Sequence, residues 1–406
     1  MPAHFSFASQ GAVSPFKPVR ALDKAMEVAV VGGGITGLFA ARYLRAAGAE
    51  VTLYERTRLG AGSVHAAGIL EGHNYYCINN LRYLRRAFRY LRSGASGFRS
   101  VDGRWLRGYV RHFGRTLAPE DLAGTAALGS RSLAEYSAMA EERNDFGFAM
   151  GGLTEYYSVR RNFRDALETV RAREMDERVE VEEKPDGTGS LHYPNMGWID
   201  TDLFVARMER EIHGTKVVTG EVGRVTLDGE VTFGGEKKQH DAVILTGGIA
   251  CRRMGLPITS VKGYGWKIRT KTPLKNAVIY ADYGIAAVPL ANGGKLTGGW
   301  DFSLSGSAAR SEKVLRIART LLELTEVGPV QMGHRPSSPD GLPIVGQKGK
   351  VVVATGGFRL GWSFAPGMAR LATDLCLGKA PPDPFLGRFV RGLRDGDLSG
   401  AFSQSA

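Results

Sequence analysis

The chain has 406 residues, 43% of them apolar, and a formal net charge of +12. This length and composition are typical of a folded globular protein with room for two domains, and they exclude disordered, fibrous and collagen-like proteins. No run of about 18 uncharged apolar residues occurs, so the sequence predicts no membrane-spanning helix.

The three cysteines, Cys77, Cys251 and Cys376, lie far apart, and none belongs to a Cys-x-x-Cys pair. This spacing argues against a disulfide framework, a zinc site and a dithiol redox site, and it favours a reducing, cytoplasmic location. Glutamine and asparagine together make up only about 3% of the chain, a depletion seen in proteins of thermophiles. We therefore expect a cytoplasmic protein from a thermophilic source.

The N-terminal segment, residues 1–25, contains Pro, Ser and Gly without an apolar period. It lacks the apolar region and cleavage site of a signal peptide, so we expect a flexible arm. Met26 directly precedes the first predicted strand, which leaves open whether translation starts at Met1 or at Met26.

A strand, a tight turn and a helix follow the arm. Residues 27–31 are a β-branched run, three glycines come next, and Leu38, Ala41 and Leu44 recur at helical spacing. A second strand at residues 50–54 ends at Glu55. These residues form a βαβ unit.

The remaining predicted elements alternate helices and strands. Helical patterns occur at 81–92, 132–143, 201–212 and 364–377, and strand patterns at 216–219, 221–227, 241–246, 258–270, 277–290, 295–299 and 351–354. The sequence thus predicts an α/β fold (α+β overall), with a Rossmann-type FAD-binding domain and a substrate domain built on an antiparallel sheet. We assign residues 26–72, 195–256 and 332–382 to the first domain, 73–194 and 257–331 to the second, and 383–406 to a C-terminal tail.

Gly32, Gly34 and Gly37 form a Gly-x-Gly-x-x-Gly pattern between the first strand and its helix, and Glu55 follows eighteen residues later. The first glycine permits the tight turn, the second lets the backbone approach a pyrophosphate, and the third lets helix and strand pack closely. The helix N-terminus favours phosphate, and the acidic residue accepts ribose hydroxyls. The pattern predicts a dinucleotide site.

Two further segments favour FAD over NAD. Residues 60–70 are a run of small side chains that leaves room for a long planar ligand, and residues 354–362 form a second junction of strand, glycines and helix. A helix N-terminus aimed at the pyrimidine edge of a flavin stabilises the negative charge that reduction places there.

In the order and spacing of its motifs the chain resembles the D-amino-acid oxidase family of FAD-dependent amine oxidoreductases, which includes glycine oxidase, sarcosine oxidase and D-amino-acid dehydrogenase. The matching pieces are VVGGGITG, YER, AAGIL, DAVILTGG, KGYG, RPSSPDGLPIVG and ATGGFRLGWSFAP. The resemblance implies cofactor contacts by Ile35, Thr36, Glu55, Arg56, Gly62, Ser63, Ala67, Gly68, Ile69, Val222, Gly247, Gly357, Phe358, Leu360, Gly361, Trp362 and Ser363, besides the three glycines of the first turn.

The resemblance also implies a substrate site. Arg335 matches the arginine that pairs with the substrate carboxylate, and Arg359 is a second candidate; the alternative for each is an ordinary ion pair. Residues 331–334 lack the cysteine that tethers the flavin of sarcosine oxidases, so we expect non-covalent FAD. The substrate-orienting tyrosine of glycine oxidase is absent from residues 285–289, leaving Tyr264 and Tyr283 as substitutes or as core residues.

The implied reaction needs little side-chain chemistry, because the flavin takes a hydride from the α-carbon of the amine substrate. The main task of the protein is orientation of the substrate by Arg335. His65, His73 and His334 are candidates for a general base, although a histidine beside a ligand is more often a hydrogen-bonded packing residue. No catalytic side chain is assigned from the sequence.

The KGYG segment resembles the D-amino-acid dehydrogenases, which favours oxidation of a D-amino acid, with D-proline as one candidate, and a quinone or dye as electron acceptor. The alternatives are an oxidase of the glycine oxidase type that reduces oxygen to hydrogen peroxide, and a flavin-binding assembly protein without turnover. The presence of Arg335 argues against the last. The oligomeric state is left open.

The positive charge is concentrated in residues 81–115, which contain ten arginines and one acid, Asp102. Its first part has the apolar spacing of an amphipathic surface helix. The segment is either a solvated face or a peripheral contact with anionic lipid on the inner face of the membrane. Nucleic acid is not expected as a partner, because no recognition motif accompanies the charge.

Overall fold

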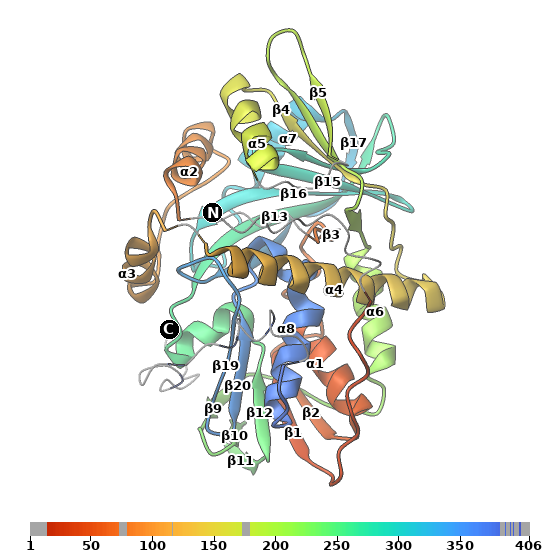
Figure 1. Cartoon of the computed structure of the whole chain (residues 1–406), viewed down its shortest axis with the longest axis vertical. Coiled ribbons are helices and arrows are strands. Elements are labelled where there is room, and N and C mark those ends of the chain that lie inside the picture. The colour runs from red at the N-terminus through yellow and green to blue at the C-terminus, as the bar shows by residue number, and fades with distance from the viewer. Residues whose placement is uncertain are drawn as a thin grey trace, which may run out of the picture.

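The computed structural model describes residues 14–72, 79–115, 117–172 and 179–381, together with Leu386, Val390, Leu393 and Leu398. The fold is mixed α/β, as predicted. In Figure 1 a parallel sheet with its helices occupies the lower half of the molecule and a large antiparallel sheet the upper half. The long helix α4 (Pro119–Arg143) runs between the two halves.

The parallel sheet has the strand order β19-β20-β12-β1-β2-β8. Its strands are β1 (Glu27–Val31), β2 (Glu50–Glu55), β8 (Lys216–Thr219), β12 (Ala242–Leu245), β19 (Ile344–Lys348) and β20 (Val351–Thr355). All neighbours run parallel except β19 and β20. The apolar runs of β1, β12 and β20 are buried, because helices cover one face of the sheet and the small sheet within residues 222–239 packs against the other.

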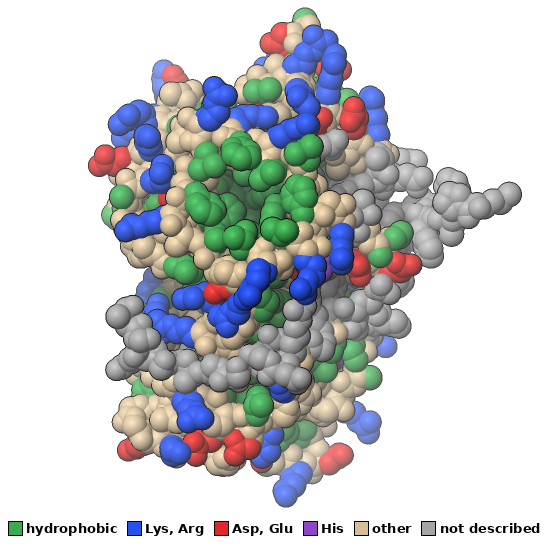
Figure 2. Space-filling model, turned by 90° about the vertical axis from the view of Figure 1, so that its left-hand side faces the viewer, with side chains coloured by type: hydrophobic (Ala, Val, Ile, Leu, Met, Phe, Trp, Pro, Cys, Tyr) green, Lys and Arg blue, Asp and Glu red, His purple; other side chains and the backbone are tan. Residues whose placement is uncertain are grey.

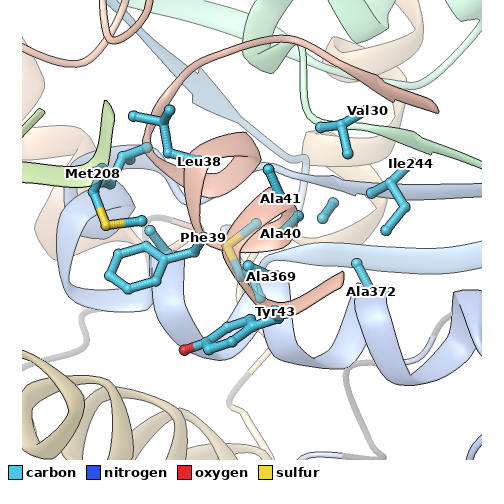
Figure 3. Close-up of a cluster of buried hydrophobic side chains, with 14 of the residues drawn as sticks. Val30, Leu38, Phe39, Ala40, Ala41, Tyr43, Met208, Ile244, Ala369 and Ala372 are labelled. Carbon is cyan, nitrogen blue, oxygen red and sulfur yellow. The ribbon is translucent and has the colours of Figure 1, made fainter. Parts of the chain in front are cut away.

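Small side chains let two helices pack closely beside this sheet. Ala40 and Ala41 of α1 (Ile35–Ala46) and Ala369 and Ala372 of α8 (Gly361–Cys376) are fully buried in one cluster (Figure 3). Phe39 lies in the same cluster and contacts aromatic rings of α4 and α6 (Thr201–Glu211). The N-terminal and C-terminal parts of the chain therefore share one core.

The other large sheet, antiparallel except for the parallel pair of β4 and β14, has the order β17-β13-β16-β15-β14-β4-β6-β5, and β18 also pairs with β13. Its strands are β4 (Leu153–Tyr157), β5 (Glu180–Glu183), β6 (Gly189–Tyr193), β13 (Thr259–Thr270), β14 (Ala277–Tyr280), β15 (Ile285–Leu290), β16 (Gly293–Phe302), β17 (Leu324–Val327) and β18 (Gln331–Ser337). The helices of this half are α2 (Leu81–Ser93), α3 (Gly103–His112), α5 (Arg160–Ala172) and α7 (Ser311–Leu321). Smaller sheets comprise β3 (Ile69–Leu70) with β7 (Gly197–Trp198), and β9 (Val222–Val225) with β10 (Glu230–Phe233) and β11 (Glu236–Gln239).

Three predicted boundaries differ from the structure. The helix expected at 132–143 begins at Pro119, because the Ala, Gly and Ser residues of its first half carry no clear apolar period. The strand expected at 277–290 is a hairpin of β14 and β15. The strand β18, which the sequence division assigned to the FAD-binding part, pairs with β13 of the antiparallel sheet.

The prediction of a loose N-terminal arm is wrong for residues 14–25. Phe16 and Val19 are buried in the core beside the parallel sheet, the Leu22 amide donates to the Ala47 carbonyl at 2.9 Å, and Arg370 donates to the Lys17 carbonyl. The segment packs without forming a helix or strand, so it leaves no periodic signal in the sequence. Residues 1–13 and most of the predicted tail, 383–406, lie outside the described residues.

None of the helices in the described part of the chain has the length and apolarity needed to cross a bilayer.

Candidate active site

The turn after β1 can be built only from glycine. Gly32 has φ +111°, and a Cβ on it would lie 2.7 Å from the backbone of Gly247, at the end of β12. A Cβ on Gly37 would lie 1.9 Å from the carbonyl oxygen of Gly32. The Thr246 hydroxyl donates to that oxygen at 2.7 Å. These contacts bring β1, α1 and β12 together and leave the N-terminus of α1 bare.

The N-terminus of α1 presents amide groups that suit an anion. Gly34 is its N-cap and brings no side-chain cap, and the first turn, which includes Thr36, contains no acidic residue. The Ile35 amide donates to Ser63 Oγ at 3.0 Å, and the Gly33 amide donates to Glu55 Oε2 at 2.7 Å. The helix dipole at such a terminus favours a phosphate group, which would compete with Ser63 Oγ for the Ile35 amide.

Hydrogen bonds join the segment after β2 to the start of α8. The Trp362 indole donates to the Ser63 carbonyl at 3.0 Å, and the Glu71 amide donates to Ser363 Oγ at 2.9 Å. The small-residue run and the C-terminal glycine junction, predicted from regions about 300 residues apart, thus lie side by side.

The backbone at the start of α8 is held in an uncommon conformation. Phe358 has φ +48°, in the left-handed region that costs a non-glycine residue about 1–3 kcal/mol. A Cβ on Gly357 would lie 3.0 Å from the Gly361 Cα, and Leu360 is buried. The backbone around Gly357 is therefore closely packed and carries no side chain at this position, so a flat ligand can lie against it.

The other residues predicted to bind the cofactor occupy the same region of the chain. Gly62 is open to space, a Cβ on Gly68 would lie 2.3 Å from the Ile199 carbonyl, and Ala67 and Ile69 pack against the cluster under β4 and β6. Val222 is buried at the start of β9, beside the parallel sheet, and Arg56 is exposed after β2.

The site is chemically suited to FAD. A bare helix N-terminus and a glycine cradle fit the pyrophosphate. At the other end, His65 Nδ1 and Gln331 Oε1 are buried, and although the two side chains interact, they make no well-formed hydrogen bond, which buried polar atoms normally have. Burial lowers the pKa of His65, so this imidazole is neutral at pH 7. His65 and Gln331 can therefore meet polar atoms of a bound group.

Arg335, on β18, is held with its guanidinium over the Trp300 ring, 4.8 Å from the ring centroid, and it donates to the Gly299 carbonyl at 2.9 Å. Burial lowers the pKa of Arg335 to about 10, so it is charged at neutral pH. A Cβ on Gly263, in the KGYG segment, would lie 2.4 Å from its Nη2. Gly263 therefore provides the space for the guanidinium.

Arg359 is already paired. Its Nη1 lies 3.0 Å from both carboxylate oxygens of Glu71, a buried residue whose pKa is raised by desolvation against the opposing effect of Arg359. The sequence did not single out Glu71. This geometry matches the ion-pair alternative for Arg359, and we do not assign it to a substrate carboxylate.

Tyr264 and Tyr283 lie in a core cluster and make no hydrogen bond to Arg335. Both pack in the cluster between the antiparallel sheet and α7, and the Tyr264 hydroxyl donates to Asp301 Oδ2 at 2.6 Å. Successive side chains of a strand point to opposite faces, and Gly263, next to Tyr264, is the residue that faces Arg335. The two tyrosines are core residues.

Tyr83 of α2 is a residue of this region that the sequence did not reveal. It packs in the cluster that contains Trp300 and Phe358, and its pKa is raised by burial and by Tyr90, while Arg359 and Arg335 lower it. Its helix was interpreted as a surface helix, and only the tertiary contact with β16 brings it inward. His334 is hydrogen-bonded to Ser260 Oγ at 2.7 Å, whereas His73 and Cys77 lie outside the described residues.

A buried lysine connects the two halves of the molecule. Lys295 of β16 is 1% exposed, and its ammonium donates to Thr201 Oγ1 at 2.6 Å and to the Val64 carbonyl. Burial lowers its pKa from 10.5 to about 8, although Asp202 and Asp200 raise it.

Lys295 should make stability depend on pH. Between pH 8 and 10.5 the unfolded chain holds a proton that the folded chain has released, so stability rises with pH in this window. We expect the unfolding free energy of wild type minus that of Lys295→Met to increase by up to about 3 kcal/mol from pH 7.5 to 10.5. Denaturant unfolding of both proteins across this range measures it. A difference that stays constant would contradict the assigned pKa.

The parallel sheet and the glycine turn define a dinucleotide-binding protein. A family model described as FAD dependent oxidoreductase (DAO) matches residues 27–375, and the chain belongs to this family. It is an FAD-dependent enzyme of the amino-acid dehydrogenase and oxidase kind, as the resemblance implied.

Known proteins similar to the chain span nearly its whole length. A D-proline dehydrogenase from Pyrobaculum islandicum is 36% identical over 373 residues, which cover 90% of this chain and all of the relative. Glycine oxidase from Geobacillus kaustophilus has a TM-score of 0.69 at 21% identity, covering 90% of this chain and 98% of its own. L-proline dehydrogenase from P. horikoshii has a TM-score of 0.62 at 16% identity, with 91% and 97% covered. The two structures support the fold.

Proposed function

We propose that the protein is an FAD-dependent D-amino-acid dehydrogenase with D-proline as its substrate. The observation that carries this proposal is the 36% identity to a D-proline dehydrogenase over the full length of that relative. The half-buried, charged Arg335 supports it, because no carboxylate in the described part of the chain lies within ion-pair distance of its guanidinium.

Arg335 is the residue that we assign to the substrate carboxylate. A planar guanidinium makes two parallel hydrogen bonds to a carboxylate, and the Trp300 ring and the Gly299 carbonyl fix its plane. FAD, when bound, accepts the hydride from the substrate α-carbon. Holding the substrate in one orientation is then the main contribution of the protein.

We assign the FAD site to the glycine turn and the two segments that converge on it. Amides at the start of α1 would bind the pyrophosphate, Glu55 and Arg56 would contact the adenosine ribose, and the backbone of Val222 would contact the adenine. Residues 62–69 and the Gly357–Ser363 junction would hold the flavin. His65, with its neutral imidazole, is the residue best placed to accept a hydrogen bond from the cofactor or a proton from the substrate amine.

We propose a quinone or an artificial dye as the electron acceptor, and a cytoplasmic location with peripheral contact to the inner face of the membrane. The second candidate is a glycine oxidase-like enzyme, which the structural similarity to glycine oxidase favours. Steady-state turnover of a panel of D- and L-amino acids tests both. We expect dye reduction with D-proline to be much faster than hydrogen peroxide formation in air. Equal rates would favour the oxidase.

The FAD should be bound without a covalent bond. Residues 331–334 contain no cysteine, and Cys251 and Cys376 are buried in the cores beside the parallel sheet. Acid precipitation of the purified protein should therefore release one FAD per chain into the supernatant. Flavin that stays with the precipitated polypeptide would contradict this prediction.

A further inference from the structure

The surface formed by α2 and α3, residues 81–113, combines exposed apolar side chains with a high positive charge. About half of the large apolar side chains that are exposed in the described part of the chain lie in this segment. Phe88, Phe98 and Val110 are 59%, 64% and 65% exposed. Figure 2 shows hydrophobic side chains gathered around a hollow on the side of the molecule that carries α2 and α3, with Lys and Arg around it.

The local sequence fixes both helices firmly. Asn80 caps α2 by accepting the Tyr83 amide at 2.8 Å, and Gly94 ends it with φ +80°. Asp102 caps α3 by accepting the amides of Arg104 and Trp105 at 2.9 and 3.2 Å. Large apolar side chains held outward by capped helices form a permanent surface, and patches of this kind mark interaction sites.

The charge on this surface is available to a partner. Seven of the nine arginines in residues 81–115 whose side chains the structure describes are exposed, namely Arg85, Arg92, Arg99, Arg104, Arg107, Arg111 and Arg115. Beside the patch, a cavity of about 310 Å³ between α2 and α5 is lined by Arg85, Arg86, Arg89 and Arg161 with Asn162 and Asp165. Guanidinium groups converging on such a space suit a phosphate group.

From these observations we propose that the α2–α3 surface docks on a membrane containing anionic lipids. Apolar side chains ringed by arginines match the boundary between acyl chains and charged headgroups. A second copy of this chain is a poor occupant, because residues 81–115 carry a net charge of +9 and two such surfaces repel each other. An acidic protein is the other occupant that the charge allows, and the test below distinguishes it.

The surface also leads to the proposed active site. Phe98 contacts Phe302 of β16 at 5.9 Å between ring centroids, and Phe302 contacts Trp105 at 6.0 Å. Two residues before Phe302, Trp300 contacts Phe358 at 5.8 Å and lies under Arg335. An acceptor dissolved in the bilayer would meet the protein on the side where this aromatic path begins. The role of the surface in meeting an electron acceptor rests on the proposed function, whereas its binding to anionic lipid does not.

Vesicle binding by the holoenzyme, measured without turnover, tests the proposal. The protein should co-sediment with phosphatidylcholine vesicles that contain phosphatidylglycerol, and far less with phosphatidylcholine alone. Each arginine near an anionic surface contributes about fivefold to binding, so changing Arg85, Arg92, Arg107 and Arg111 to Gln should weaken it by about 100-fold or more. Binding should also decrease as salt rises above roughly 0.1 M, where the Debye length is about 10 Å.

A matched control removes the same charge elsewhere. Four exposed lysines lie on or beside strands of the other half of the molecule, namely Lys216, Lys237, Lys238 and Lys350. Their change to Gln should leave binding to the anionic vesicles within about twofold of the wild-type value. The double variant Phe88→Ser, Phe98→Ser keeps every arginine and should bind more weakly at high salt. Dye-linked turnover should be unchanged in the arginine and lysine variants.

Three outcomes would overturn the proposal: absence of binding to anionic vesicles, equal sedimentation of the arginine variant and wild type, or self-association in sedimentation velocity that the phenylalanine variant abolishes. The first would leave an acidic protein as the partner. If the wild-type protein bound the vesicles but showed no turnover with amino acids, only the proposed function would be contradicted.

Discussion

Replacing Arg335 with methionine should lower kcat/KM for the amino-acid substrate by about 30- to 5000-fold while FAD stays bound. Loss of one partner of a buried, charged hydrogen-bonded pair costs roughly 2–5 kcal/mol. Methionine has a similar length and no charge, so the pocket stays filled while the carboxylate loses its partner. Stopped-flow reduction and steady-state turnover measure the effect, and flavin absorbance reports cofactor content.

Two further variants separate charge from position. Arg335→Lys retains a cation without the planar pair of donors, so it should recover only part of the activity. Gly263→Ala keeps the arginine but places a methyl group 2.4 Å from its present Nη2 position, so it should raise KM by displacing the guanidinium. Arg316→Met, on the exposed side of α7, is the control. Wild-type kcat/KM in Arg335→Met would remove Arg335 from the substrate site.

Replacing Gly37 with alanine should weaken FAD binding by about 10- to 100-fold. The added Cβ would lie 1.9 Å from the Gly32 carbonyl oxygen, and neither atom belongs to a flexible side chain, so α1 must move away from β1. Overpacking of this kind costs typically 1–3 kcal/mol and shifts the backbone. The amides at the start of α1 then no longer converge on one phosphate position.

The readout for Gly37→Ala is the amount of FAD per chain and the dissociation constant obtained by titrating FAD into apoprotein. Gly306→Ala serves as control, because a Cβ on Gly306 meets nothing within 4 Å. If Gly37→Ala retained FAD as wild type does, the glycine turn would not be the cofactor site.

The parts of the fold that could be predicted are those in which neighbouring residues carry the signal. The β1–α1–β2 unit is contiguous, so a β-branched run, three glycines and a helical period suffice to define it. The pairing of residues 60–72 with the start of α8 was inferred from the resemblance, because hydrogen bonds such as Trp362 to Ser63 join residues about 300 positions apart.

The surroundings of Arg335 could not be predicted for the same reason. Trp300 and Gly263 reach it through the pairing of β13 with β16 and β18, and Glu71 reaches Arg359 from the far end of the sequence. Strand register determines these contacts, and no local pattern reports it. The N-terminal segment 14–25 was predicted to be flexible because a segment that packs without forming a helix or strand shows no periodic pattern of apolar residues.

The measurement that most directly tests the proposed function is anaerobic mixing of the holoenzyme with D-proline and, separately, L-proline, followed by flavin absorbance. We predict that D-proline bleaches the flavin rapidly and completely within one mixing experiment, that L-proline leaves it oxidised, and that Arg335→Met slows the bleaching by D-proline. Flavin that stays oxidised with D-proline and with every other D-amino acid tested would contradict the account.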